Sequence, residues 1–174
     1  VVGDAQRLAK VLDTPWMRER LTKPLTIVPQ FRNLFENAWQ TYRRLLPGAG
    51  PAGRDPRPEE AERPVLFLSG DLPFATAQEI SAFVRRGLES GADYALGVVP
   101  EEAMEGFYPR ADGEPGVKMA YFNMREGRFR QSNLHLVRPA RLGKQQYVEE
   151  MYENRYQKQL GNVLRLAWKI ATDE

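Results

Sequence analysis

Residues 65–84 read VLFLSGDLPFATAQEISAFV, and this stretch decides the fold. Val65–Leu68 is continuously apolar, which is typical of a strand that is buried on both faces, as in a parallel sheet. Thr76 and Glu79 form a Thr-x-x-Glu capping box, and the apolar residues that follow recur at helical spacing. Residues 94–99 read as a second strand that ends at a proline. The order strand, helix, strand predicts a βαβ unit with a right-handed crossover.

Strands and helices also alternate on either side of this unit. Apolar residues at i, i+3 and i+4 predict the helices, and short apolar, β-rich runs predict the strands. The predicted strands cover residues 1–3, 25–28, 117–123 and 128–137, and the predicted helices cover residues 4–12, 33–46 and 144–174. The fold class that follows is α/β, with three layers (αβα) around a mostly parallel, mixed central sheet.

Length and composition limit the function classes. The chain has 174 residues, enough for one domain over residues 1–174. Its 25 Lys and Arg against 23 Asp and Glu give a charge of +2, too small for a nucleic-acid binder. It has no Cys and one His, which excludes disulfides, thiolate metal sites and multi-His clusters. No membrane-length apolar run or secretory signal is present, so no membrane partner and a cytoplasmic location are expected.

Residues 47–63 differ in composition from the rest of the chain. Four Pro and three Gly fall among these 17 residues, and no large apolar side chain is present. Such a stretch buries too little surface to offset the entropy of ordering, so a mobile insertion within the domain is predicted.

Asp71 is the residue on which the chemical interpretation depends. It follows the predicted strand 65–68, and ligands of open α/β sheets bind beyond the carboxyl ends of strands. Gly70 lets the backbone approach a ligand closely. A single carboxylate here suits Mg²⁺, which takes oxygen ligands and often accepts only one or two from protein. A turn cap before Pro73 explains Asp71 equally well, so the residues alone leave both roles open.

The run 65–84, together with GADYALGVVP at residues 91–100, resembles the core of nucleotidyltransferases with a GT-A-type fold. The molybdenum-cofactor guanylyltransferase-like group is the nearest. The resemblance implies a Rossmann-like, nucleotide-diphospho-sugar transferase fold. It also implies that Asp71, the Asp of the family's Gly-Asp-x-Pro motif, binds the catalytic Mg²⁺ between the nucleotide phosphates. The implied reaction moves a nucleoside monophosphate from a nucleoside triphosphate (NTP) to a phosphorylated or sugar-like small-molecule acceptor and releases pyrophosphate.

The resemblance nominates further contacts to the nucleotide or the acceptor, beside Gly70. Gln30 and Asn33 match a loop that touches the base or ribose, although a helix cap at Asn33 explains that residue as well. Asn133 matches a strand residue that contacts the acceptor or ribose. Lys118 could hold phosphate, and a solvated basic hairpin accounts for it equally. His135, two residues beyond Asn133, is better explained as a neutral, hydrogen-bonded core residue than as a catalyst.

The family's glycine-rich loop, of the type Leu-Ala-Gly-Gly-x-x-x-Arg, is missing from residues 1–174. Its backbone amides cradle the triphosphate. The best alignment places residues 1–3 at the end of the family's second strand. We therefore expect the domain to be incomplete at its N-terminus, with the first strand and the phosphate loop upstream of residue 1.

Two other functions stay open. The missing loop motivates a non-catalytic nucleotide-binding or regulatory domain. A metal-dependent glycosyltransferase that uses a nucleotide sugar is the other, but Ser69 stands where its Asp-x-Asp motif would have the first Asp. The helix predicted over 144–174 could cover the sheet, extend the acceptor site or form a homodimer.

Overall fold

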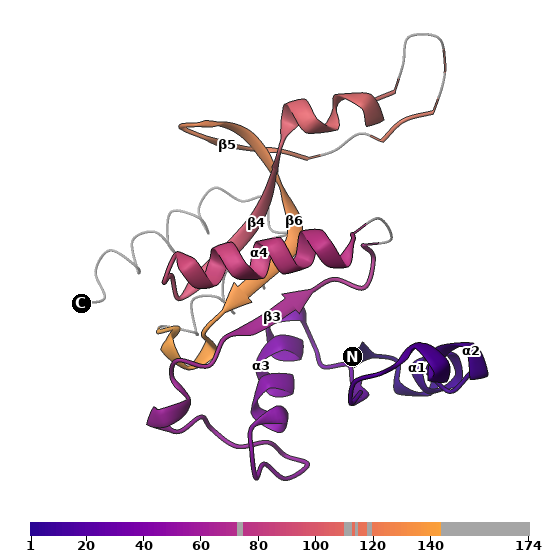
Figure 1. Ribbon diagram of the computed structural model, residues 1–174, viewed down its shortest axis with the longest axis vertical. Helices are drawn as coiled ribbons and strands as arrows, with labels where there is room; N and C mark the ends of the chain where they lie inside the picture. Colours follow the sequence, from indigo (N-terminus) through magenta and orange to yellow (C-terminus); the bar gives the residue numbers. More distant parts are fainter. Residues whose placement is uncertain (73–74, 110–112, 114, 118–119, 144–174) are drawn as a thin grey trace. The chain divides into compact units, whose positions relative to one another are not determined.

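The computed structural model describes residues 1–72, 75–109, 113, 115–117 and 120–143 (Figure 1). The chain divides into two compact units, which are described separately: Val1–Ala61 with the chain after Arg141, and Glu62–Arg141. One domain over residues 1–174 stays a prediction. The predicted helix 144–174 and Lys118 lie outside the described residues.

The first unit contains two short strands and three helices. Its elements are β1 (Val2–Gly3), α1 (Ala5–Leu12), α2 (Pro15–Arg20), β2 (Val28–Pro29) and α3 (Leu34–Leu45). The strands β1 and β2 run parallel, with Val2 opposite Val28. Helix α1 begins where the Asp4 side chain accepts hydrogen bonds from the backbone N–H groups of Gln6 and Arg7. The sequence does not predict α2, which begins at a proline in the first helical position, where the missing N–H costs nothing.

The proline-rich segment 47–63 contains a short 3₁₀ helix, Pro58–Glu60. Arg54 forms an ion pair of 2.5 Å with Glu60. Its guanidinium also donates to the Pro47 carbonyl over 2.8 Å. The segment thus holds polar contacts of its own in place of an apolar core, and its mobility stays a prediction.

The second unit contains the motif stretch. Its elements are β3 (Val65–Leu68), α4 (Ala77–Glu89), β4 (Tyr94–Pro100), η2 (Glu101–Phe107), β5 (Phe122–Met124), β6 (Gly127–Val137) and η3 (Pro139–Arg141). The strands form one four-stranded sheet in the order β3-β6-β4, with β5 paired to β6. The predicted hairpin at 117–137 is thus present, although its first strand is shorter and begins at Phe122.

The α/β class is confirmed, but the mostly parallel central sheet is corrected in this unit. Both β3 and β4 pair antiparallel with β6, which lies between them. The strands β3 and β4 therefore run in the same direction, as a βαβ unit requires, without pairing to each other. A parallel pairing occurs instead between β1 and β2. The three-layer arrangement and the Rossmann-like transferase fold as a whole stay predictions.

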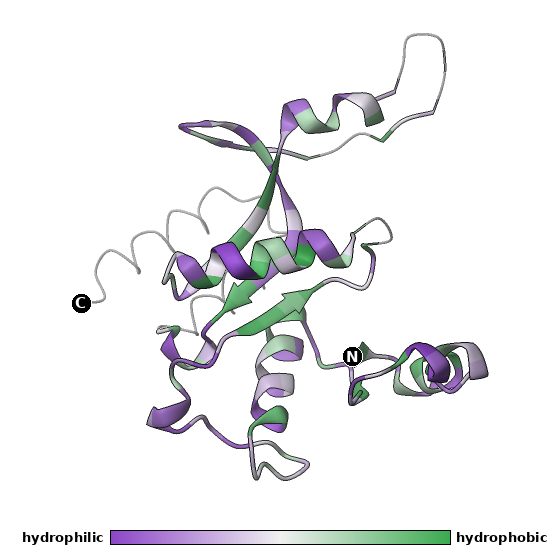
Figure 2. Cartoon of the chain, in the orientation of Figure 1, coloured by the Kyte–Doolittle hydropathy of each residue, from purple (hydrophilic) through white to green (hydrophobic). Residues whose placement is uncertain are grey.

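Helix α4 covers one face of this sheet (Figure 1). The predicted capping box is present, because Thr76 accepts from the Glu79 N–H while the Glu79 side chain accepts from the Thr76 N–H. Gly87 allows close packing, since a Cβ at Gly87 would lie 2.7 Å from Cδ2 of Leu136. Leu134 and Leu136 are buried in β6, and Figure 2 shows β3 and β4 largely apolar.

Strand β3 is less buried than its composition predicts. Leu68 is 49% exposed, and Val65, Leu66 and Phe67 are only partly buried. The reason is its place at the edge of the described sheet, where it pairs with β6 alone. Within the described residues, none of the helices has the length and apolar character that crossing a membrane requires.

Candidate functional site

Asp71 lies in the loop that leaves β3, where the sheet ends. The last pair between β3 and β6 joins Leu68 to Leu134. One residue further on, the Ser69 N–H donates to the backbone carbonyl of Asn133 over 3.4 Å. The Ser69 hydroxyl then donates to Oδ1 of Asp71. The structure thus brings together two predicted site residues, Asp71 and Asn133, through a serine that lies between them.

The described residues after Asp71 include the cap of α4. The Ala75 N–H donates to the Leu72 carbonyl over 3.2 Å, and Thr76 follows as the helix cap. Hydrogen bonds from the backbone N–H and the hydroxyl of Thr76 lower the pKa of Glu79, which keeps that carboxylate charged. Strand β6 thus holds the chain just before Asp71, and the capping box fixes the start of α4 after it.

Strand β6 has a bulge beside this loop. Leu96 of β4 lies opposite His135, yet Val98 lies opposite Gln131, so two steps along β4 match four steps along β6. The extra residues fall at 132–134, opposite Gly97. A Cβ at Gly97 would lie 2.2 Å from Oγ of Ser132 and 3.2 Å from Cβ of Leu134. The bulge therefore needs a glycine on the neighbouring strand.

Asn133 has the backbone conformation that marks the bulge. Its φ of 58° makes it the one residue other than glycine with a positive φ in the part of the chain that the structure describes. Asn tolerates this left-handed conformation better than most residues. Bulges and left-handed residues of this kind occur often beside active sites, where they change the direction of a strand or a side chain.

The chemistry of the loop fits a divalent cation with few protein ligands. Asp71 is exposed, and its one described hydrogen bond, from Ser69, engages Oδ1. Within the described residues, no three His, Cys, Asp or Glu side chains lie close enough together to hold a metal. The Asp71 carboxylate is a hard oxygen donor, and Mg²⁺ is often held by one or two protein oxygens plus phosphates and water. The chemistry of Asp71 therefore fits Mg²⁺.

Gly70 has no packing reason to be a glycine. A Cβ at this position would meet no described atom within 4 Å, and its φ is not in the positive region. The close approach of a ligand to Gly70 stays a prediction, and no neighbour within the described residues competes for that space.

Two further predicted residues, Gln30 and Asn33, lie in the first unit and are described apart from Asp71. The Asn33 side chain accepts from the Glu36 N–H over 2.8 Å and so caps α3, which is the structural role the sequence left open. The Gln30 side chain is exposed, while its backbone N–H donates to the Gly3 carbonyl over 3.0 Å. The remaining nominated contact, Lys118, lies outside the described residues.

His135 is held by a tyrosine. The Tyr94 hydroxyl and Nδ1 of His135 form a hydrogen bond of 2.7 Å. Burial lowers the pKa of His135 and raises the pKa of Tyr94, so both side chains are neutral near pH 7. This geometry suits the structural role for His135 rather than a catalytic one.

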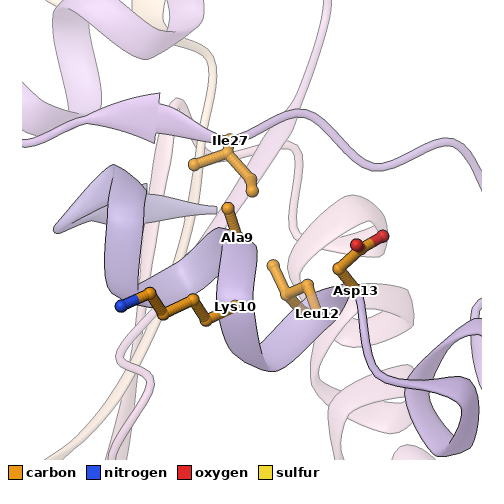
Figure 3. Close-up of a pocket in the computed structure, with 5 residues that line it drawn as sticks. All are labelled: Ala9, Lys10, Leu12, Asp13 and Ile27. Carbon is orange, nitrogen blue, oxygen red and sulfur yellow. The ribbon is translucent and has the colours of Figure 1, made fainter.

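A shallow pocket lies beside α1 in the first unit, lined by Ala9, Lys10, Leu12, Asp13 and Ile27 (Figure 3). Its two charged side chains point away from each other in the figure. Asp13 is moreover paired with Arg18 at 2.5 Å. The pocket contains none of the predicted site residues.

Sequence reasoning missed the bulge and the role of Ser69. Two signals could have pointed to them. Gly97 interrupts an apolar strand, which often marks a bulge or a close backbone approach. Ser69 and Asp71 are two residues apart, a spacing at which a short polar side chain can hydrogen-bond to a nearby residue of the same loop.

Comparison with known proteins finds a similar fold in a solved structure. No protein-family model and no curated protein matches this sequence. A solved structure described as a hypothetical transferase from Thermus thermophilus is similar, with 23% sequence identity and a TM-score of 0.54. The match covers 87% of this chain and 57% of the Thermus chain, so this chain spans little more than half of that protein.

Proposed function

We propose that this chain is part of a Mg²⁺-dependent nucleotidyltransferase. The observation that carries the proposal is Asp71, an exposed carboxylate held beyond the end of β3 by Ser69 beside a bulged strand. That is where open α/β sheets bind their ligands. The similar Thermus structure, described as a hypothetical transferase, supports a transferase in general.

The proposed reaction joins a nucleoside monophosphate to an acceptor. An oxygen of a phosphorylated or sugar-like acceptor attacks the α-phosphorus of the NTP, and the bond from that phosphorus to the bridging oxygen breaks. Pyrophosphate leaves with the electron pair of the broken bond. Bound Mg²⁺ would offset the charge on the phosphates. Asp71 would hold the cation, and Ser69 would keep the carboxylate oriented.

The other predicted residues take supporting roles in this proposal. Gly70 gives the phosphates room to approach the backbone, because no described atom would oppose them there. Asn133 lies next to Ser69 at the bulge and would contact the ribose or the acceptor. Gln30 and Asn33 are proposed as base or ribose contacts and Lys118 as a phosphate contact. At Asn33 the backbone is a better candidate for this contact than the side chain, because the side chain caps α3.

The test is release of pyrophosphate by the full-length protein with Mg²⁺, each of the four NTPs and a panel of sugar phosphates. The expected result is acceptor-dependent release with one NTP and its loss in Asp71→Asn. The matched control is Glu89→Gln. Glu89 is also an exposed carboxylate and is the last residue of α4, about 18 Å along the helix axis from its first residue, Ala77. Release that survives in Asp71→Asn would contradict the proposal. NTP binding without release would favour the non-catalytic function, and sugar transfer from a nucleotide sugar would favour a glycosyltransferase.

A further inference from the structure

We propose that Ser69 is the positioning residue for Asp71, and that pairing with β6 holds Ser69 in place. The proposal deepens the metal site and rests on the proposed function for the identity of the cation. The arrangement of the side chains can be tested without any ligand.

The first step is the contact between the two side chains. The Ser69 hydroxyl donates to Oδ1 of Asp71. Ser69 is partly buried, whereas Asp71 is exposed. An exposed Asp side chain without such a contact would exchange among several rotamers. The contact engages Oδ1 and leaves Oδ2 without a described hydrogen bond. A carboxylate that is already held in one rotamer binds a cation at a lower entropic cost.

The second step is the anchor of Ser69 itself. Its backbone N–H donates to the carbonyl of Asn133, one residue beyond the last paired position of β3. Asn133 offers this carbonyl from the left-handed conformation that the bulge imposes. This bond continues the β3–β6 register, in which Leu68 lies opposite Leu134. Strand β6 is thus connected to the Asp71 carboxylate through one backbone bond and one side-chain bond.

The third step is the chemical identity of residue 69. A hydroxyl can donate to a carboxylate, whereas an ionised carboxylate at the same position would repel it. Serine therefore supports a site with a single negative charge, in which the nucleotide phosphates supply the remaining charge. Threonine would keep the hydroxyl, and alanine would remove it while leaving the backbone bond to Asn133 intact.

The experiment compares the full chain as wild type, Ser69→Ala, Ser69→Thr and Ser81→Ala. Ser81 is a matched control, since its hydroxyl donates to the Ala77 carbonyl within α4. The first readout is the rotamer distribution of Asp71 from NMR side-chain couplings without metal. The second is the affinity for Mg²⁺, measured by calorimetry with each NTP present.

We expect one Asp71 rotamer in the wild type, Ser69→Thr and Ser81→Ala, and averaging among rotamers in Ser69→Ala. Mg²⁺ affinity should fall about tenfold in Ser69→Ala, as is usual when a partner behind a metal ligand is removed, and should recover in Ser69→Thr. An unchanged Asp71 rotamer in Ser69→Ala would overturn the positioning role. Rotamer averaging in Ser69→Ala without Mg²⁺ binding by the wild type would instead refute the proposed function and leave the positioning role intact.

Discussion

Replacing Gly97 by alanine is the sharpest test of the bulge. The new Cβ would lie 2.2 Å from Oγ of Ser132 and 3.2 Å from Cβ of Leu134. The Ser132 hydroxyl is buried, which restricts its freedom to rotate away. The Gly97 backbone is not in the positive-φ region, so alanine adds crowding without backbone strain.

The magnitude follows from that crowding. Overpacking a close contact costs about 1–3 kcal/mol. For a chain of 174 residues, each kcal/mol corresponds to about 2–4 °C of melting temperature. Urea unfolding should therefore show a lower midpoint for Gly97→Ala, with an unchanged slope if the unfolded state is unaffected. Gly70→Ala is the matched control, because its Cβ would meet no described atom within 4 Å, and its stability should stay near that of the wild type.

Ser132→Ala allows a double-mutant cycle. The Ser132 hydroxyl is buried and has no hydrogen-bond partner within the described residues, so its removal should be neutral or slightly stabilising. In that background Gly97→Ala loses its worst contact, and we expect about 0.5–3 kcal/mol of coupling between the two changes. A Gly97→Ala variant as stable as the wild type, or a double variant with no coupling, would refute the bulge geometry.

Three further predictions concern single residues. Thr76→Ala should lower the unfolding free energy by about 0.5–2 kcal/mol in urea titrations, because it removes the α4 cap, and Thr76→Ser should restore most of it. The Arg54 guanidinium and the Arg57 N–H lower the pKa of Glu60 from 4.5 to about 2. The stability that Glu60 contributes is thus present above pH 4.5 and lost as the pH falls toward 2, so Glu60→Gln should flatten the stability profile in that window, and an unchanged profile would contradict the pairing. Burial lowers the pKa of His135 below 6.5, so NMR titration of this single histidine should give a midpoint below that value, and a midpoint at or above it would contradict this effect of burial.

Local features of the second unit were predictable from sequence because they depend on neighbouring residues. The apolar run Val65–Leu68 and the capping box at Thr76 specify a strand and a helix start within a few positions of each other. Asp71 could be nominated because it follows directly on that strand. The Asn33 cap likewise depends on Glu36, three residues away.

Pairing between distant segments was not predictable in the same way. The antiparallel insertion of β6 depends on contacts such as Leu68 with Leu134, which are far apart in the chain. An apolar strand at a sheet edge has the same composition as one in the middle, so the exposure of Leu68 could not be read from its neighbours. The left-handed Asn133 depends on the bulge opposite Gly97, which exists only once β4 and β6 are paired. Its contact with Ser69 depends on the pairing of β3 with β6.

The most direct test of the central claim is nucleotide binding by the full-length protein, measured by calorimetry with Mg²⁺ and again with excess chelator. The account predicts that the NTP which supports pyrophosphate release binds only with Mg²⁺, and that Asp71→Asn weakens this binding by at least about tenfold while Glu89→Gln leaves it unchanged. Binding of equal strength in the wild type and Asp71→Asn, with the same dependence on Mg²⁺, would contradict it.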